Sequence, residues 1–193
     1  MDWILASASP RRKQLFKEVV DAFEIIVANG EERVLETSPK ALVQLLAKQK
    51  AEEVASCERA QGKCVLGADT VVAYEGEILG KPKDEADAKR MLKMLSGKTH
   101  EVYTGVCIVY PDGKEGRKEL LRADCTRVQF NELSDAFIDA YVQGGSPMDK
   151  AGAYGIQDGG LVARIEGSFT NVVGLPVELC QEMVQSIKAL KKG

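Results

Sequence analysis

A short polar turn near the start of the chain carries the first residues whose types and spacing could do chemistry. Residues 5–12 read LASASPRR, an apolar run followed by Ser9-Pro10, which is a strong start signal for a helix. The free backbone N–H groups of such a start, the hydroxyl of Ser7 and the guanidinium groups of Arg11 and Arg12 together suit a phosphate. The same residues also fit a capped helix with solvated arginines. The segment lacks the GxxxxGK[ST] pattern, so it is not a P-loop.

An acidic residue in an apolar run is the second candidate. Asp69 interrupts the strand-like segment 65–74 (VLGADTVVAY), and Glu31 and Glu32 lie in an earlier turn. A carboxylate within a β run costs desolvation free energy unless it has a partner or a task. Converging carboxylates can hold Mg²⁺ beside phosphates, and one of them can act as general base toward water. The alternative is a structural Asp that bonds to a neighbouring turn.

Cations and an amide near structural breaks form the third group. Lys50, Lys81 in a Gly-Lys-Pro sequence and Lys150 in DKAGAYG could neutralise a polyphosphate, although most lysines are simply solvated. The side-chain amide of Gln157 offers a donor and an acceptor, which match the N3–H and carbonyl of uracil or thymine; the alternative is a surface Gln. The single histidine, His100, is expected to have a packing role, since no G-x-S-x-G motif supports a serine hydrolase triad.

The apolar patterning predicts the elements that must position these residues. Strands are expected over residues 3–6, 23–28, 65–74, 77–79, 102–110, 120–130 and 161–165. Helices are expected after Ser9 (with Leu15, Phe16, Val19 and Val20 inward), Ser38, Asp84 and Ser134 (with Phe137, Ile138, Tyr141 and Val142 inward), and from Pro176. Residues 149–157 are expected as a loop. Early alternation of strands and helices with a central meander predicts an α/β fold with a mixed sheet.

Composition limits the class of protein. The 193 residues, 45% hydrophobic and 28% charged, suit one domain of one lobe or two, and a net charge of −3 argues against a nucleic-acid-binding face. The five cysteines form no C-x-x-C pair, so reduced thiols in a cytoplasmic protein are expected rather than a zinc site. No apolar run could span a bilayer and no signal-peptide core is present, so no membrane partner is expected.

Taken together, the motifs resemble the Maf family of nucleotide pyrophosphatases. Eight stretches carry the resemblance in family order over nearly the whole chain: LASASPRR (5–12), GEE (30–32), KQKA (48–51), GADTVV (67–72), GKP (80–82), LSGKTHEVYTG (95–105), DKAGAYGIQ (149–157) and GSFTNVVGLP (167–176). The resemblance implies a Maf/ITPase-like α/β fold over residues 1–193 as a single domain. It is expected to be an elongated, two-lobed molecule with a central mixed sheet and an active-site cleft between the lobes.

The resemblance also implies an activity and its residues. A nucleoside triphosphate is hydrolysed to the monophosphate and pyrophosphate with a divalent cation, Mg²⁺ or Mn²⁺. Asp69 falls on the family's proton acceptor and Glu32 on the acid that works with it through metal or water. Phosphate-handling positions are matched by a further set: Ser7, Arg11, Arg12, Lys50 and Lys81. A homodimer is the family expectation.

Three positions indicate the branch of the family. Arg12, Thr70 and Gln157 match the branch that resembles dTTP/UTP pyrophosphatases, a nucleotide-pool house-cleaning role that could extend to modified pyrimidine triphosphates. Two alternatives stay open: a pyrophosphatase of other specificity, for 7-methyl-GTP or broad, and a nucleotide-binding regulator of cell division. The acids and lysines that turnover needs are all present, which favours an enzyme, and a regulatory role could coexist with it.

Overall fold

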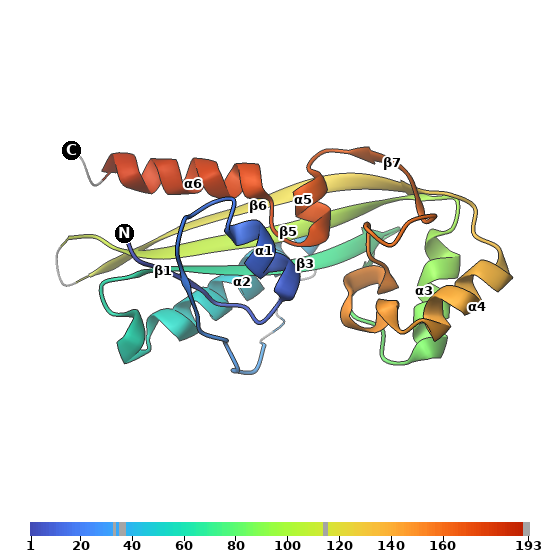
Figure 1. The fold of residues 1–193 in the computed structure, drawn as a ribbon, viewed down its shortest axis with the longest axis horizontal. Helices are drawn as coiled ribbons and strands as arrows, with labels where there is room; N and C mark the ends of the chain where they lie inside the picture. Colours follow the sequence, from blue (N-terminus) through green and yellow to red (C-terminus); the bar gives the residue numbers. More distant parts are fainter. Residues whose placement is uncertain (33, 35–37, 114–115, 191–193) are drawn as a thin grey trace. The chain divides into compact units, whose positions relative to one another are not determined.

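The secondary structure follows the predicted alternation of strands and helices (Figure 1). The computed structural model describes all residues except 33, 35–37, 114–115 and 191–193. The strands are β1 (Trp3–Leu5), β2 (Glu24–Ile25), β3 (Cys64–Tyr74), β4 (Glu77–Leu79), β5 (Thr99–Pro111), β6 (Arg117–Phe130) and β7 (Val162–Glu166). The α-helices are α1 (Pro10–Phe16), α2 (Pro39–Ala55), α3 (Glu85–Leu95), α4 (Asp135–Gln143), α5 (Phe169–Val173) and α6 (Val177–Leu190). Short 3₁₀ helices are η1 (Glu58–Ala60), η2 (Ser146–Asp149) and η3 (Ala151–Ala153).

The strands form a mixed sheet, as the sequence predicts. Its order is β2-β1-β3-β5-β6-β7, with β4 paired to β3. β1 runs parallel to both β2 and β3, whereas β4 is antiparallel to β3 and β7 is antiparallel to β6. Because β1 and β3 are parallel neighbours, with Leu5 opposite Leu66, the residues that follow β1 come to the same edge as the middle of β3. This pairing positions the opening turn beside the strand that carries Asp69.

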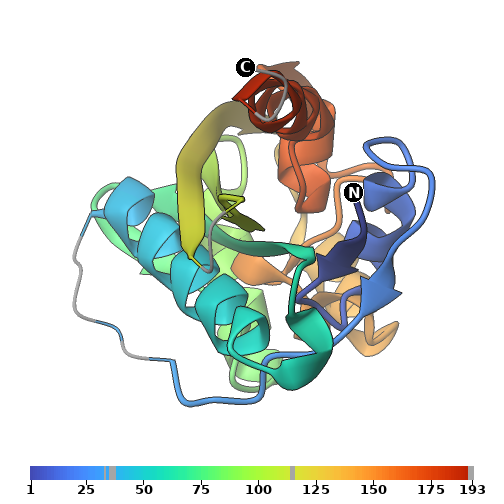
Figure 2. The ribbon, with the colours of Figure 1, turned by 90° about the vertical axis from the view of Figure 1, so that its left-hand side faces the viewer.

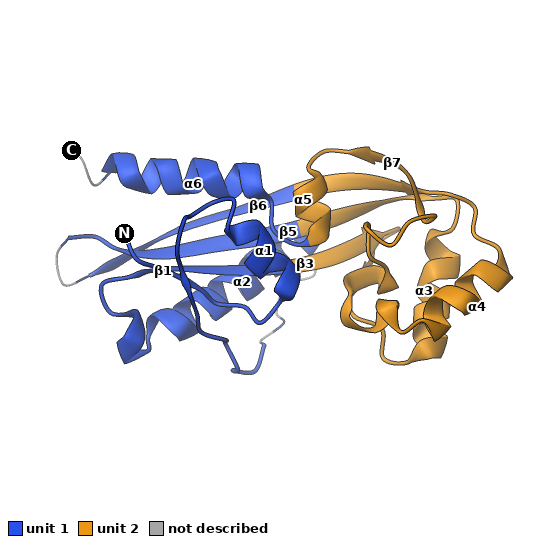
Figure 3. Cartoon of the chain, viewed as in Figure 1, with its two compact units in different colours: residues 1–69, 104–124, 174–193 blue, residues 70–103, 125–173 orange. Residues whose placement is uncertain are grey.

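The chain divides into two compact units, coloured separately in Figure 3. Unit 1 comprises residues 1–69, 104–124 and 174–193, and unit 2 comprises residues 70–103 and 125–173. Three strands, β3, β5 and β6, contribute residues to both units. Among the candidate site residues, Ser7, Arg11, Arg12, Glu32, Lys50 and Asp69 belong to unit 1, and Thr70, Lys81 and Gln157 belong to unit 2.

Unit 1 is built on its strands with helices on both sides. α2 and α6 run on opposite sides of the strands of this unit (Figure 2). The small residues Ala47 and Ala51 of α2 are fully buried against Ile4 and Val65 of the sheet. Glycines let α2 approach closely: a Cβ added to Gly105 in β5 would lie 2.1 Å from the carbonyl oxygen of Val43. The position of α2 relative to the strands is therefore fixed by backbone contact.

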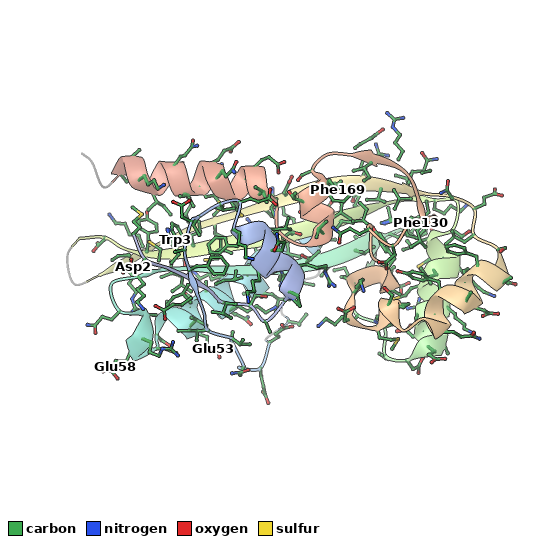
Figure 4. All side chains as sticks on the ribbon, in the orientation of Figure 1. Asp2, Trp3, Glu53, Glu58, Phe130 and Phe169 are labelled. Atoms are coloured by element: carbon green, nitrogen blue, oxygen red, sulfur yellow. The ribbon has the colours of Figure 1, made fainter. Side chains whose placement is uncertain are left out.

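Unit 2 has a separate core under α3 and α4. Leu92 and Leu95 of α3, Ile138 of α4 and Leu161 all have at most 1% of their surface exposed. Phe130, labelled in Figure 4, is also buried in this cluster. The apolar faces of the helices predicted after Asp84 and Ser134 therefore pack on this core, as expected.

Several boundaries differ from the sequence-based prediction. α1 ends at Phe16, so the prediction that Val19 and Val20 continue it is wrong; the N–H groups of Glu18 and Val19 bond three residues back, to Leu15 and Phe16, which tightens and ends the helix. The strand predicted over 23–28 is limited to Glu24–Ile25, because its partner β1 has only three residues. η2, η3 and α5 were not predicted, and all three are too short to carry a helical apolar period.

Candidate active site

The site in unit 1 begins with a close contact between β3 and α2. A Cβ added to Gly67 would lie 2.4 Å from the carbonyl oxygen of Ala47 and 2.8 Å from the backbone nitrogen of Ala51. Only glycine fits at this point, and the backbones meet directly. Since side chains two apart in a strand share a face, Asp69 lies on the same side of β3 as Gly67, next to α2. The glycine before the acid therefore sets how near α2 comes to it.

Lys50 joins two carboxylates that are far apart in the sequence. Its Nζ lies 2.5 Å from Oδ1 of Asp69 and 2.9 Å from Oε1 of Glu32. The side chains of Lys50 and Asp69 are only 20% and 14% exposed, whereas that of Glu32 is 50% exposed. One ammonium thus offsets the repulsion between two acids, one held in the sheet and one at the surface. The structure brings together the two acids predicted for proton transfer and metal binding and one of the lysines predicted for phosphate.

Glu53 holds the turn that carries Glu32. This role of Glu53 was not predicted from the sequence. Oε1 of Glu53 accepts hydrogen bonds from the backbone N–H groups of Asn29, at 2.8 Å, and Gly30, at 3.1 Å; Oε2 also accepts from Gly30, at 3.1 Å. Glu53 lies three residues after Lys50, so both side chains are on one face of α2. That spacing is a signal the sequence contained. Two side chains of α2 therefore act on this turn: Glu53 bonds to the backbone of the turn, and Lys50 pairs with Glu32.

The opening turn is organised by its two serines. Oγ of Ser7 accepts a hydrogen bond from the N–H of Ser9 at 3.2 Å, and Oγ of Ser9 accepts from the N–H of Arg12 at 3.4 Å. The capped start with Pro at the first helical positions is confirmed. Ser7 is 8% exposed, so its hydroxyl is largely withdrawn from bulk water. The cations of this turn are Arg11 and Arg12.

Arg12 belongs to the same electrostatic cluster as the acids. Its Nε donates to the carbonyl oxygen of Gly174 at 2.8 Å, which fixes the guanidinium. Burial lowers the pKa of Arg12, attraction to Asp69 and Glu32 counteracts this shift, and repulsion from Arg11 adds to it. An arginine remains charged through such a shift. The half-buried guanidinium of Arg12, with the charge of Arg11 close by, could therefore stabilise the negative charge of a phosphate.

Two of the three candidate residues of unit 2, Lys81 and Gln157, lie in turns rather than in regular elements. Lys81 is exposed just after β4, and the carbonyl oxygen of the preceding Gly80 accepts a hydrogen bond from the N–H of Gly152 at 3.0 Å. That bond ties the Gly-Lys-Pro segment to the loop that leads to Gln157, which is exposed. Thr70 directly follows Asp69 in β3 and is partly buried.

The residues present suit a divalent cation only in part. No cluster of three or more His, Cys, Asp or Glu side chains with metal-binding geometry occurs in the part of the chain that the structure describes. Mg²⁺, however, is commonly bound by one or two carboxylates together with substrate phosphates and water. Asp69 and Glu32, brought together by Lys50, supply such a pair. The donor set therefore fits a cation that arrives with a polyphosphate.

His100 has a packing role, as predicted. It is 1% exposed, its Nε2 lies 2.8 Å from the hydroxyl of Tyr154, and its ring packs edge-on against Phe130. Burial lowers the pKa of His100 to about 4, so the ring is neutral near neutral pH. All five cysteines lie among the described residues, and none of them forms a disulfide. Among the described residues, no helix is both long and apolar enough to cross a membrane.

Comparisons with known proteins agree on one family. A family model described as "Maf-like protein" matches residues 2–187. A dTTP/UTP pyrophosphatase of Agathobacter rectalis is 51% identical over 195 residues, covering 93% of this chain and 95% of the relative. Proteins of the same name from Bacillus cereus and Thermococcus gammatolerans are 50% and 48% identical, covering 94% and 91% of both chains, respectively.

Solved structures confirm the fold class. The Ham1 protein of Staphylococcus aureus superposes with a TM-score of 0.56 at 14% identity, covering 96% of this chain and 99% of that chain. A HAM1 protein of Coxiella burnetii gives a TM-score of 0.51 at 12% identity, covering 98% of each chain. At such low identity these likenesses concern the fold alone.

Proposed function

The chain belongs to the Maf family, and we propose that it hydrolyses dTTP and UTP to the monophosphate and pyrophosphate. Three relatives that cover over nine-tenths of the chain carry the name of that activity. The activity is a hydrolysis of an acid anhydride and would remove triphosphates from the nucleotide pool, modified pyrimidine triphosphates included. The observation that carries the proposal is the cluster of Lys50, Asp69 and Glu32 beside Arg12.

In this mechanism Asp69 is the general base. Its carboxylate accepts a proton from the water whose oxygen attacks the α-phosphorus. The bond from that phosphorus to the oxygen bridging to the β-phosphate breaks, and pyrophosphate leaves with the bond electrons. Lys50 holds Asp69 in place through its 2.5 Å contact and keeps a positive charge beside the reacting phosphate. Positioning and electrostatic stabilisation then supply most of the rate acceleration.

Several cations offset the negative charge of the polyphosphate, and one hydroxyl donates to it. Ser7, Arg11, Arg12 and Lys50 of unit 1 and Lys81 of unit 2 are assigned to phosphate oxygens. Arginine suits this task because its fork of N–H donors matches two phosphate oxygens at once. A divalent cation, Mg²⁺ or Mn²⁺, held by Asp69 and Glu32, would supply Lewis-acid polarisation of phosphate oxygens.

Base selection is assigned to three residues. Gln157 reads the N3–H and the neighbouring carbonyl that thymine and uracil share, because its amide both accepts and donates. Thr70 and Arg12 complete the set that distinguishes this branch from one acting on 7-methyl-GTP. Cytosine presents a ring acceptor and an amino donor on the same edge, so it reverses the pattern that Gln157 meets in uracil.

A substrate panel tests the activity. The purified chain is incubated with dTTP, UTP, dCTP, dGTP and 7-methyl-GTP, with Mg²⁺ or Mn²⁺, and pyrophosphate release is measured. The highest kcat/KM is expected for dTTP and UTP. A flat profile, or a preference for 7-methyl-GTP, would overturn the pyrimidine assignment. Binding of triphosphates with no turnover of any of them would support a regulatory protein instead.

The proposal extends to organisation and place in the cell. Residues 1–193 are taken to act as one pyrophosphatase domain, although the fold contains two compact units. A cytoplasmic location follows from the substrate pool, and a homodimer follows from the family, with no nucleic acid as partner. Light scattering of the purified chain is expected to give twice the mass of 21.0 kDa, and the monomer mass would refute the dimer.

A further inference from the structure

The turn that carries Gln157 is closed by a hydrogen bond of its own backbone. The N–H of Asp158 donates to the carbonyl oxygen of Gly155 at 3.0 Å, so residues 155–158 form a four-residue turn with Ile156 and Gln157 at its two central positions. Ile156 is partly buried and packs against the core of unit 2, whereas Gln157 is exposed. The side chain of Gln157 therefore lies on the solvent side of a turn that Ile156 anchors to the core.

A single phenol from α4 bridges both ends of this turn. The hydroxyl of Tyr141 accepts a hydrogen bond from the N–H of Gly155 at 3.0 Å and donates one to Oδ2 of Asp158. One hydroxyl therefore contacts the first residue of the turn through its backbone and the last residue through its side chain. A hydroxyl has one proton and two lone pairs, so this arrangement uses its donor fully.

The acid at the end of the turn is held by a second donor. The hydroxyl of Ser146 donates to the same oxygen of Asp158 at 2.7 Å. Lys150 in turn donates to Oγ of Ser146 at 3.2 Å and to its carbonyl oxygen at 2.5 Å. The network links α4, η2 and the turn, and it leaves little room: a Cβ on Gly155 would lie 2.6 Å from Oδ2 of Asp158.

The protonation states keep the bridge intact at neutral pH. Burial and the hydrogen bond to Asp158 raise the pKa of Tyr141 to about 12, so its hydroxyl keeps the proton it donates. Partial burial acts to raise the pKa of Asp158, but the hydrogen bonds from Tyr141 and Ser146 outweigh it and lower that pKa. Asp158 therefore stays ionised and accepts from both hydroxyls.

From this geometry we infer that Tyr141 and Asp158 are positioning residues for substrate specificity, which hold the turn that presents the amide of Gln157 to a thymine or uracil base. The inference rests on the proposed function, in which Gln157 contacts the base. If the turn moved, the amide would no longer meet the N3–H and the carbonyl of uracil at the distances and angles that distinguish uracil from cytosine. The network fixes the backbone from which that amide extends, so selectivity depends on it while the chemistry in unit 1 does not.

The test compares Tyr141→Phe, Gln157→Ala and the double variant in the full chain. kcat and KM are measured separately for dTTP and dCTP, with folding checked by circular dichroism and thermal unfolding. Tyr141→Phe keeps the ring that stacks on Phe137, with 6.2 Å between the ring centroids, and removes only the hydroxyl. We expect the ratio of kcat/KM for dTTP to that for dCTP to fall about tenfold, as for a lost hydrogen bond to a charged group, mainly through a higher KM for dTTP.

Two further variants separate position from general damage. Asp158→Asn removes the charge at the other end of the bridge and is expected to lower the same ratio even if Tyr141→Phe folds poorly. Tyr74→Phe is the matched control, because it removes a hydroxyl that donates to exposed Glu75, at 3.0 Å, and it should leave the ratio unchanged.

The outcomes distinguish this inference from the proposed function. If the network acts through Gln157, adding Tyr141→Phe to Gln157→Ala lowers the ratio no further. Independent, multiplicative losses would overturn the inference, and so would an unchanged ratio in both Tyr141→Phe and Asp158→Asn while Gln157→Ala lowers it. An unchanged ratio in Gln157→Ala would instead refute the base-reading role in the proposed function.

Discussion

The two units hold their candidate residues by different means. In unit 1, Lys50 and Asp69 lie on a helix and a strand whose backbones touch at Gly67, and a carboxylate on the same helix holds the turn that carries Glu32. In unit 2, Lys81 and Gln157 lie in turns that are fixed by individual hydrogen bonds. The proposed general base and its lysine are thus fixed by packed backbone, and Gln157, which is assigned to base recognition, lies in a turn fixed by a side-chain network.

This difference has a physical reason. A general base and the cations around a reacting phosphorus must keep their geometry within fractions of an ångström, and regular elements hold a group better than loops do. Base recognition needs one or two directed hydrogen bonds, which a short anchored turn can supply. A turn can also change its residues with little effect on a core, so specificity can vary while the reaction stays the same.

Replacing Asp69 with Asn gives the largest expected effect on this comparison. The amide cannot accept the proton of the attacking water, so kcat should fall by about 10²–10⁴-fold, which is the usual contribution of a general base. The dTTP to dCTP ratio of kcat/KM should stay as in the unaltered chain, because the distinction between thymine and cytosine is assigned to Gln157 in unit 2. Near-normal turnover by a folded Asp69→Asn protein would show that the base is another group.

Acid should destabilise unit 2 through His100. The unfolded chain binds a proton at His100 below about pH 6.5, whereas the folded ring, with its pKa lowered to about 4 by burial, does not. The unfolded state then binds more protons between these values, so stability falls as pH drops from 6.5 toward 4, by at most about 3 kcal/mol. Urea unfolding at several pH values measures the slope.

His100→Gln is the matched variant for that slope. Its amide does not titrate and can still bond to the hydroxyl of Tyr154, so the free energy of unfolding should depend less on pH between 6.5 and 4. Asp158 does not confuse the result, because its lowered pKa places its own contribution to acid instability below 3.8. Equal slopes for the two proteins would show that His100 is not the group responsible.

Most of the longer helices and strands of both units are predicted from the sequence. Capping residues and apolar periods locate α2, α3 and α4, and Asp69 stands out because it interrupts an apolar strand. The contact of Lys50 with Glu32 could not be predicted from periodicity, since it depends on Gly67 allowing two backbones to meet and on a turn outside any element. The roles assigned to these residues came from the family resemblance.

Side-chain networks are the part that patterning misses. The apolar period predicts Tyr141 as an inward residue of its helix, and it is partly buried, but the period says nothing of its hydroxyl. Asp158 and Ser146 carry no pattern at all, because their partners come from segments 12 to 17 residues away. Such contacts are decided by the tertiary structure, in which each buried donor must find an acceptor.

The smallest expected effect concerns the turn of unit 1 that Glu53 holds. Glu53→Gln weakens the bonds to the N–H groups of Asn29 and Gly30, because a neutral oxygen replaces a charged one. Glu32 should then be placed less well, and kcat for dTTP should fall by about tenfold, the equivalent of roughly 1.4 kcal/mol, with the dTTP to dCTP ratio preserved.

Glu52→Gln is the control for that variant, since it changes the adjacent residue of α2 in the same way. Glu52 pairs with Lys48 at 3.7 Å, and its side chain is 53% exposed, so its loss should cost less than about 1 kcal/mol of stability and leave kcat unchanged. Equal kcat for Glu53→Gln and Glu52→Gln would mean that the turn is held without Glu53. A fall in the ratio rather than in kcat would mean that the turn carrying Glu32 takes part in distinguishing thymine from cytosine, and the separate roles given to this turn and to the turn of Gln157 would be wrong.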